Sequence, residues 1–237
     1  MKFTLCVPAY NEEDIIVRTI SELYDVLIHL PTDIEWKIII ADNGSTDKTR
    51  EKVFALRYDQ VLIMSTSEKG KGIAIRGAVK NLDADLFGFI DADLSADPKI
   101  IPEMLRLLIE NEEDLVVGSR FYNKILVNRS LWRNASSRIF NLLQSLILGV
   151  RVRDTQCGLK IMNKKGIIVL NECKEKSWFL DLELLARAEQ KKLKIKEIPV
   201  KWEEFKYKDR ISKLRVLRDG FSAIIAMFRI RIRLNKL

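Results

Sequence analysis

The segment "LFGFIDADLSADP" (residues 86–98) joins an apolar run directly to a cluster of carboxylates. Residues 86–90 predict a buried strand, and Asp91, Asp93 and Asp97 follow it. In an extended chain the side chains of Asp91 and Asp93 point the same way, and two close carboxylates repel each other unless a cation lies between them. Hard divalent cations such as Mg²⁺ or Mn²⁺ take such oxygen ligands and keep coordination positions for substrate phosphates. We therefore predict that Asp91 and Asp93 bind a metal ion that carries a diphosphate.

Two further polar clusters follow predicted strands, in "VPAYNEE" and "IIIADNGSTD". Their candidate site residues are Pro8, Tyr10, Glu12, Asp42 and Asn43. The carboxyl ends of parallel strands meet at one edge of a sheet, where ligands bind. We therefore expect these side chains to lie near Asp91 and Asp93. Helix capping is the alternative explanation for acidic residues in such loops, and we favour it for Asp47 and Asp97.

The elements that position these clusters alternate along the first half of the chain. The predicted strands are 2–10, 36–42, 60–66, 86–91 and 114–120, and the predicted helices are 12–30, 45–56, 71–82 and 98–111. This alternation predicts an α/β fold with a mostly parallel sheet and helices on both faces. Further on we expect a helix at 131–150, a strand at 159–163, a helix at 181–192 and a strand at 194–202. We assign residues 1–212 to one domain and residues 213–237 to a basic amphipathic segment at a membrane surface.

Several function classes are excluded by residues that the sequence lacks. The chain has one histidine, His29, which excludes a Ser-His-Asp triad and histidine-rich metal sites. Its three cysteines include no CxxC pair, which argues against disulfides or a zinc site and favours a reducing cytoplasm. The first strand–helix turn reads "PAYNEE" rather than GxGxxG, and no GxxxxGK[ST] occurs, so dinucleotide and P-loop sites are not expected. No apolar run approaches the ~20 residues of a membrane-spanning helix.

Positive charge is concentrated in the second half of the chain. Residues 1–120 carry 14 basic and 22 acidic side chains, whereas residues 121–237 carry 27 and 11. The last 32 residues, 206–237, have ten basic and two acidic side chains around the apolar residues Phe221, Ile224, Ile225 and Phe228. Basic residues and one apolar helical face hold proteins on anionic membranes, so we expect peripheral binding to the cytoplasmic face of a membrane. Nucleic acid is not expected as a partner, because the acidic cluster would repel its phosphates.

A family resemblance rests on the order of these motifs. The segments "VPAYNEE", "IIIADNGSTDKT", "KGKGIAIRGA", "FIDADLSADP" and "VVGSRF" resemble the inverting glycosyltransferases of family 2, which have the GT-A fold. The later segments "DTQCGLKIM", "WFLDLELL", "IPVKW" and "SKLRVLRDG" are similar to the polyprenyl-phosphate sugar synthases of that family, and most similar to the dolichyl-phosphate glucosyltransferases. This resemblance covers residues 3–220. It implies metal-dependent transfer of glucose or mannose from UDP-glucose or GDP-mannose to dolichyl or polyprenyl phosphate, with inversion.

The resemblance also implies roles for individual residues. The nucleotide sugar would contact Pro8, Tyr10, Glu12, Asp42, Asn43, Lys71, Asp91, Ala92, Trp202 and Lys213, the last two from a C-terminal flap. Asp91 and Asp93 would hold Mg²⁺ or Mn²⁺, and Asp93 would belong to the catalytic group. Arg120 would lie between donor and acceptor, with Arg133 and Ser137 at the acceptor phosphate. Arg133 could equally be a surface arginine near lipid head groups. Asp181 is a further catalytic candidate that could instead cap its helix.

The chemistry of a phosphate acceptor agrees with this composition. Its oxygen is already anionic, so transfer to it needs no strong general base, and a chain with one histidine can carry it out. The metal neutralises the leaving diphosphate, and arginines hold the acceptor phosphate through two bonds. The alternative acceptor is a hydroxyl of a glycan or protein, which would require a base. Asp181 is the candidate for that base.

Overall fold

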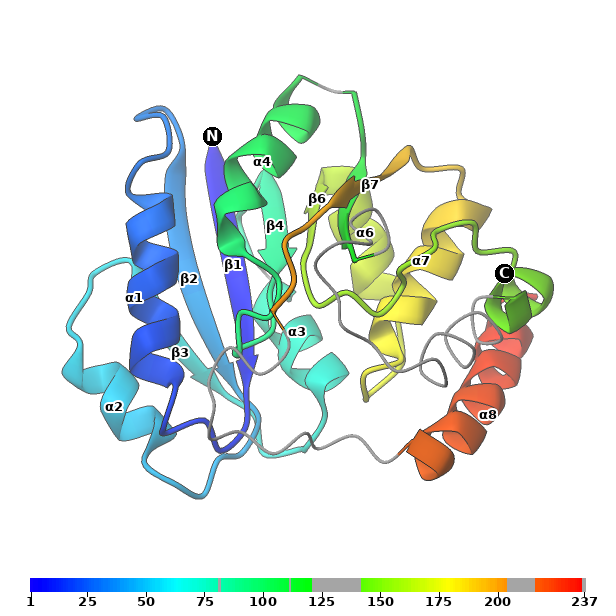
Figure 1. The fold of residues 1–237 in the computed structure, drawn as a ribbon, viewed down its shortest axis with the longest axis horizontal. Helices are drawn as coiled ribbons and strands as arrows, with labels where there is room; N and C mark the ends of the chain where they lie inside the picture. The colour runs from blue at the N-terminus through cyan, green and yellow to red at the C-terminus, as the bar shows by residue number, and fades with distance from the viewer. Residues whose placement is uncertain (81, 111, 121–141, 204–215, 236–237) are drawn as a thin grey trace.

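The structure, a computed structural model, describes residues 1–80, 82–110, 112–120, 142–203 and 216–235. It contains a seven-stranded sheet with the strand order β3-β2-β1-β4-β6-β5-β7 (Figure 1). The strands are β1 (Lys2–Ala9), β2 (Glu35–Asp42), β3 (Val61–Ser65), β4 (Leu86–Phe89), β5 (Leu115–Ser119), β6 (Lys160–Asn163) and β7 (Ile195–Pro199). Neighbouring strands are parallel except at β6, which is antiparallel to both β4 and β5. The sheet is therefore mostly parallel, as predicted.

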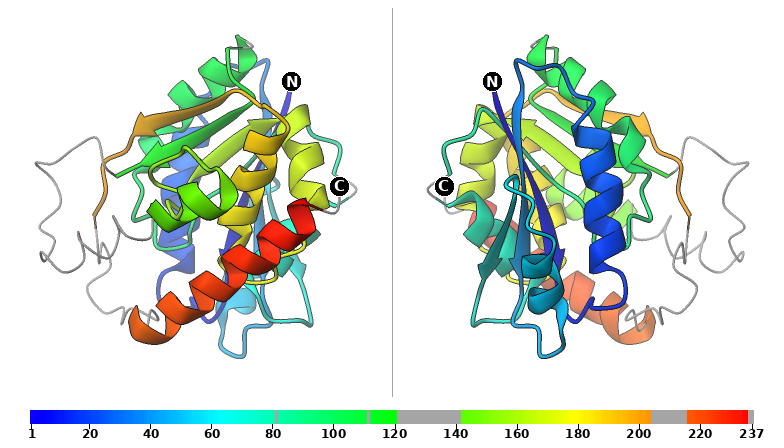
Figure 2. Two further views of the ribbon diagram at one scale, coloured as in Figure 1. Left: turned by 90° about the vertical axis from the view of Figure 1, so that its right-hand side faces the viewer. Right: turned by 90° about the vertical axis from the view of Figure 1, so that its left-hand side faces the viewer.

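Helices cover both faces of this sheet and bury its apolar side chains in two clusters (Figures 1 and 2). The first cluster contains residues of α1 (Ile16–Leu27), α2 (Thr49–Ala55) and α4 (Ile101–Ile109), which follows a short 3₁₀ helix, η1 (Pro98–Ile100). The second contains residues of α3 (Lys71–Val79), α6 (Lys164–Glu172), α7 (Leu180–Gln190) and α8 (Val216–Leu234). The predicted α/β architecture with helices on both faces is confirmed.

Two features near β6 were not predicted. The strand itself runs against its neighbours, and helix α6 follows it without a break. Asn163 ends β6 and caps α6, because its Oδ1 accepts bonds from the N–H groups of Lys165 (2.9 Å) and Gly166 (3.3 Å). In the sheet register Lys160 lies between Phe89 of β4 and Val117 of β5. The antiparallel direction therefore brings the start of β6 to the edge where β4 and β5 end.

Helix α8 divides its apolar side chains between the core and the surface. Its buried residues are Ala223, Ala226, Met227, Ile230 and Leu234, and its exposed apolar residues are Ile224, Ile225, Phe228 and Ile232. Buried Glu175 accepts bonds from Arg229 (2.7 and 2.6 Å) and Arg233 (2.8 Å). The described part of the predicted membrane-surface segment is thus packed into the domain. Within the described residues, no helix combines the length and the apolar character needed to cross a bilayer.

Candidate active site

The predicted site residues of the described chain gather at the carboxyl edge of the sheet. Asp42 ends β2 and pairs in register with Ala9 of β1. Asp91 lies two residues beyond β4, and Arg120 immediately follows β5. Since β5 and β7 are parallel, the segment that carries Trp202 leaves the sheet at this same edge. The structure therefore brings to one edge of the sheet side chains that are up to 192 positions apart in the sequence, from Tyr10 to Trp202.

The loop after β1 is held to the loop after β2 by Asn11. This residue has a left-handed backbone (φ 52°), which asparagine tolerates better than most residues. Its N–H donates to Ser45 Oγ (2.9 Å), and its Oδ1 accepts from the N–H of Thr46 (2.8 Å). The neighbouring predicted residues are fixed in the same way. The hydroxyl of Tyr10 accepts a bond from Lys69 Nζ (2.9 Å), and the N–H of Glu12 donates to Thr49 Oγ1 (2.8 Å).

Asp42 has an oxygen that accepts no hydrogen bond from the described residues. The residue is fully buried, and its Oδ1 accepts a bond from the N–H of Ser45 (3.2 Å). Its Oδ2 is buried without a hydrogen-bond partner among the described residues, and Arg50 Nε lies 3.8 Å away. A buried acceptor left unpaired costs about 1–3 kcal/mol. The position suits a ligand that supplies an N–H donor, such as a nucleotide base.

Three other predicted nucleotide contacts lie in or next to the strands at this edge. Asn43 Oδ1 accepts a bond from the N–H of Gly70 (2.6 Å), which joins the β2 loop to the start of α3. Ala92 is buried, and its carbonyl accepts a bond from Thr19 Oγ1 of α1 (2.6 Å). Pro8 lies inside β1 opposite Ala41. These residues form part of the carboxyl edge of the sheet.

Residues 91–97, the DxD loop, make a tight turn after β4. Leu94 has a left-handed backbone (φ 46°), which is unfavourable for a leucine, and its N–H donates to the Asp91 carbonyl (3.0 Å). Asp93 Oδ1 accepts a bond from the N–H of Ser95 (3.1 Å). Asp97 caps η1 by accepting a bond from the N–H of Lys99 (3.0 Å), as predicted. The loop thus fixes the carboxylate of Asp93 at the edge of the sheet.

The oxygen ligands that the DxD loop offers suit a small hard cation whose other ligands come from a substrate. Asp91 and Asp93 offer carboxylate oxygens, which Mg²⁺ and Mn²⁺ prefer. In the part of the chain that the structure describes, no group of three or more His, Cys, Asp or Glu side chains could hold a metal by itself. Phosphate oxygens of a diphosphate would therefore have to supply further ligands.

Lys71 connects Asp91 to a buried ion pair. Its Nζ lies 2.8 Å from Asp91 Oδ1 and 3.2 Å from Asp181 Oδ2. Burial alone would lower the pKa of Lys71, but the charges of Asp181 and Asp91 raise it above its usual value, so the ammonium stays charged. The other Asp181 oxygen accepts a bond from the fully buried Lys160. Lys160 was not among the site residues predicted from the sequence. The sign that could have revealed it is a single lysine within the apolar run "GLKIM".

Gly158 makes room for the Asp91 side chain. A Cβ atom at position 158 would lie 2.0 Å from Asp91 Oδ2 and 2.4 Å from its Cγ. No side chain can occupy that space without displacing the carboxylate. The segment "CGLK" therefore combines a glycine that accommodates Asp91 with a lysine, two residues later, that binds Asp181.

Arg120 is held by a buried aspartate that sequence reasoning also missed. Its Nε and Nη2 donate to Asp154 (2.7 and 2.6 Å), and so does its backbone N–H (2.8 Å). The N–H of Asp154 donates in turn to Glu197 of β7 (2.9 Å). Burial lowers the pKa of Arg120, but the bonds to Asp154 and the more distant charge of Asp91 raise it above its usual range. The guanidinium stacks on the ring of Trp202, with 4.7 Å from Cζ to the centroid.

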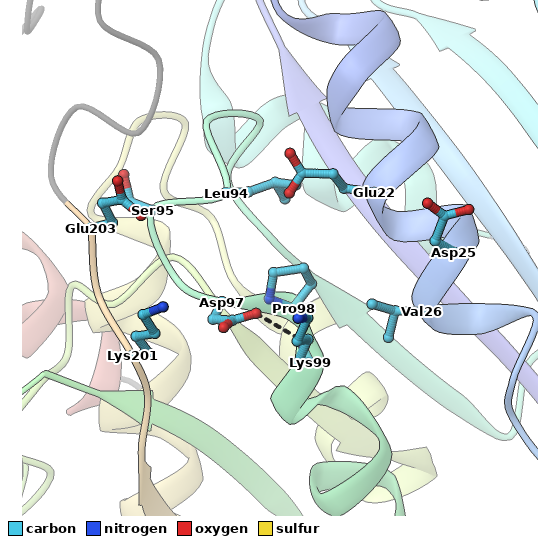
Figure 3. Close-up of a pocket in the computed structure, with 10 residues that line it drawn as sticks. All are labelled: Glu22, Asp25, Val26, Leu94, Ser95, Asp97, Pro98, Lys99, Lys201 and Glu203. Carbon is cyan, nitrogen blue, oxygen red and sulfur yellow. Dashed lines mark hydrogen bonds between the residues drawn. The ribbon is translucent and has the colours of Figure 1, made fainter.

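The segment after β7 that carries Trp202 is hydrogen-bonded to the DxD loop. Ala96 and Trp202 form an antiparallel bridge, flanked by bonds from Asp97 N–H to the Lys201 carbonyl (3.0 Å) and from Glu203 N–H to the Ser95 carbonyl (2.9 Å). A hollow of about 430 Å³ lies beside this contact (Figure 3). It is lined by Glu22, Asp25, Val26, Leu94, Ser95, Asp97, Pro98, Lys99, Lys201 and Glu203. None of these belongs to the predicted site, so the hollow is not the predicted nucleotide pocket.

Three predicted site residues, Arg133, Ser137 and Lys213, lie outside the described residues. The three cysteines lie within them and are free and buried. Burial raises the pKa of each thiol, that of Cys157 to about 12. They therefore remain protonated near neutral pH and do not act as nucleophiles.

Comparisons with known proteins identify the family and the fold of the chain. Residues 4–170 match the profile described as Glycosyl transferase family 2. The chain is 30% identical to Glycosyltransferase AglD of Haloferax volcanii over 86% of its own length and only 33% of that protein's. It is 30% identical to dolichyl-phosphate beta-glucosyltransferase ALG5D of Trichomonas vaginalis, over 95% of this chain and 73% of the other. The crystal structure of Mycobacterium tuberculosis glucosyl-3-phosphoglycerate synthase with Mn²⁺ and UDP-glucose superimposes with a TM-score of 0.66 and 18% identity, over 97% of this chain and 78% of that one. This likeness shows the GT-A fold.

Proposed function

The chain belongs to glycosyltransferase family 2, and from this premise we propose that it transfers glucose or mannose to a dolichyl or polyprenyl phosphate, with inversion. The donor would be UDP-glucose or GDP-mannose. The name of the Trichomonas relative supports the lipid phosphate and glucose, and the UDP-glucose and Mn²⁺ of the mycobacterial structure support a metal-bound nucleotide sugar. The observation that carries the proposal is the placement of Asp42, the DxD loop and Arg120 along one edge of the sheet.

On the donor side, Asp42 and the DxD loop have separate tasks. The unpaired Oδ2 of Asp42 accepts an N–H of the base, with Pro8, Tyr10, Glu12 and Asn43 forming the surrounding wall. Asp91 and Asp93 would hold Mg²⁺ or Mn²⁺, which when bound neutralises the charge of the leaving diphosphate. Lys71 adds a fixed positive charge beside Asp91.

On the acceptor side, Arg120 supplies a preorganised guanidinium. Asp154 engages its Nε and Nη2, and since no described residue binds Nη1, we assign Nη1 to a phosphate oxygen. Arg133 and Ser137 would complete the phosphate site. A hydroxyl acceptor is the second candidate, but it needs a base, and both oxygens of Asp181 are bound to lysines. The geometry therefore favours an acceptor that arrives as an anion.

The test of this function is incorporation of labelled sugar into lipid. The protein is incubated with Mn²⁺, phytanyl phosphate and, in separate reactions, UDP-glucose and GDP-mannose carrying labelled sugars. Label extracted into organic solvent with one of the two donors is the expected result. Phytanol, which lacks the phosphate, is the matched control acceptor and should remain unlabelled. Transfer to phytanol or only to water-soluble glycans would overturn the phosphate acceptor, and no transfer with any donor would overturn the proposal.

We also propose that one side of the molecule binds an anionic membrane. The helix at residues 142–148 and α8 lie on the same side (Figure 2) and expose Leu142, Leu146, Ile224, Ile225, Phe228 and Ile232. Exposed Arg231 lies among them on α8, whereas Arg229 and Arg233 are paired with Glu175. Burying such side chains in lipid is favourable by about 25 cal/mol per Å². Membrane binding by this surface would therefore depend more on apolar contacts than the number of basic residues in the sequence indicated.

Flotation with liposomes checks this surface. We expect the protein to float with vesicles that contain anionic lipid at low salt. Replacing Ile225 and Phe228 together with glutamate should abolish flotation, because two charges would enter the lipid interface. Phe54 is an equally exposed aromatic residue on α2, at the opposite side of the molecule in Figure 1, and Phe54→Glu is the matched control. A protein that remains in the soluble fraction, or a double variant that still floats, would contradict this surface.

A further inference from the structure

Lys160 is a fully buried cation whose three N–H groups all have acceptors. Its Nζ donates to Asp181 Oδ1, to the carbonyl of Cys157 (2.7 Å) and to the carbonyl of Thr155 (3.1 Å). A buried charge is tolerated when it is paired and every hydrogen bond is made. The ring of Phe89 adds a contact, because its centroid lies 5.5 Å from this Nζ and 5.7 Å from that of Lys71. Lys160 is therefore fixed in position.

The loop that Lys160 holds touches both sides of the candidate site. Thr155 and Cys157 lie between Asp154, which binds Arg120, and Gly158, which lies against Asp91. Fixing the two carbonyls fixes these neighbours as well. Lys160 is thus tied to the acceptor side through Asp154 and to the donor side through Gly158.

Asp181 links Lys160 to the donor side by a second route. One of its oxygens binds Lys160 and the other binds Lys71, which reaches Asp91. The carboxylate is buried, and both of its oxygens are engaged by ammonium groups. A general base needs an oxygen within reach of the proton that it removes. Asp181 offers no such oxygen in this arrangement.

We infer that Lys160 and Asp181 are positioning residues, which hold Lys71 and Asp91 ready for the metal-bound diphosphate, and that Asp181 is not a base. This inference rests on the proposed function. The buried pair acts through Lys71 and through the loop at residues 154–158, without touching the substrate. Its loss lets the Asp91 carboxylate and the Lys71 ammonium move, which weakens binding of the donor before any chemistry occurs.

Binding of nucleoside diphosphate tests the inference without turnover. The affinities of the wild type and of Asp181→Asn for UDP and GDP are measured by calorimetry, with and without Mn²⁺. In Asp181→Asn one carboxylate oxygen becomes an amide that faces an ammonium. Mn²⁺-dependent affinity should fall roughly tenfold or more, the scale seen when groups behind metal ligands are removed. Unchanged affinity with lost turnover would mean that Asp181 acts in the chemical step, and would overturn the inference.

A second variant separates positioning from folding. Lys160→Met with Asp181→Leu removes both buried charges and leaves apolar side chains of similar size, a replacement that proteins often tolerate. We expect its melting temperature to exceed that of Lys160→Met alone, while the affinity for diphosphate remains low. Recovery of affinity together with stability would show a merely structural role and overturn the inference. Lys164→Met, which removes an exposed lysine four residues along, is the matched control and should bind normally. A wild type that binds neither diphosphate would count against the proposed function itself.

Discussion

Replacing Asp93 with alanine should reduce sugar transfer by roughly a thousandfold while the protein stays folded. Asp93 is one of two carboxylates that the DxD loop offers to a metal, and metal stabilisation of a leaving group contributes several kcal/mol. Its Oδ1 accepts a bond from the N–H of Ser95, which the alanine variant loses. Transfer is measured with labelled donor and phytanyl phosphate, and folding by circular dichroism.

Two further variants in the DxD loop separate charge from loop structure. Asp93→Asn keeps an oxygen that can accept the Ser95 bond but removes the charge, so it should be nearly as inactive as the alanine variant. Asp97→Asn changes an aspartate in the same loop that caps η1 and should leave most of the activity intact. Full turnover by Asp93→Ala would remove this residue from the mechanism. Loss of activity in Asp97→Asn to the same degree would attribute both effects to distortion of the loop.

The arrangement of the first half of the sheet could be predicted from the sequence because the local signals are strong. Each strand there is a short apolar run, and each is followed by polar residues at the edge where parallel strands end. Asp42 and Asp91 stood out because a carboxylate after a buried strand needs a partner. Among the described residues, Asp42 has the N–H of Ser45 at one oxygen and no hydrogen-bond donor at the other, whereas Asp91 has Lys71.

The second half was less predictable because its signals are not local. The run "LKIMN" indicates a strand but not its direction, and the antiparallel direction of β6 is what brings Gly158 and Lys160 to the site. The partnership of Arg120 with Asp154 joins residues 34 positions apart that no periodicity connects. On α8, alanines at positions 223 and 226 form part of the buried face, whereas Ile224, Ile225, Phe228 and Ile232 are exposed.

The position of Gly158 leads to the second large expected effect. Gly158→Ala should lower transfer and Mn²⁺-dependent diphosphate binding by about a hundredfold, because the new Cβ would lie 2.0 Å from Asp91 Oδ2. Either the carboxylate or the loop at residues 154–158 must move, and a displacement of about 1 Å at a reacting centre can cost about 10²-fold. Calorimetry with UDP and GDP and the phytanyl phosphate assay measure the two losses. Gly77→Ala is the control, since the nearest atom to its Cβ would be the flexible end of Met64 (3.0 Å), and Thr66 Cγ2 would lie at an ordinary contact distance of 3.6 Å.

A double-variant comparison shows whether the clash with Asp91 is the cause. Once Asp91 is replaced by alanine, its carboxylate no longer occupies the space beside position 158. Gly158→Ala should then add little to the loss caused by Asp91→Ala, so the two effects should be strongly non-additive. Additive losses would mean that Gly158 acts through something other than Asp91, and an active Gly158→Ala enzyme would mean that Asp91 tolerates displacement. In either case the close contact between Gly158 and Asp91 would not be what fixes the Asp91 carboxylate.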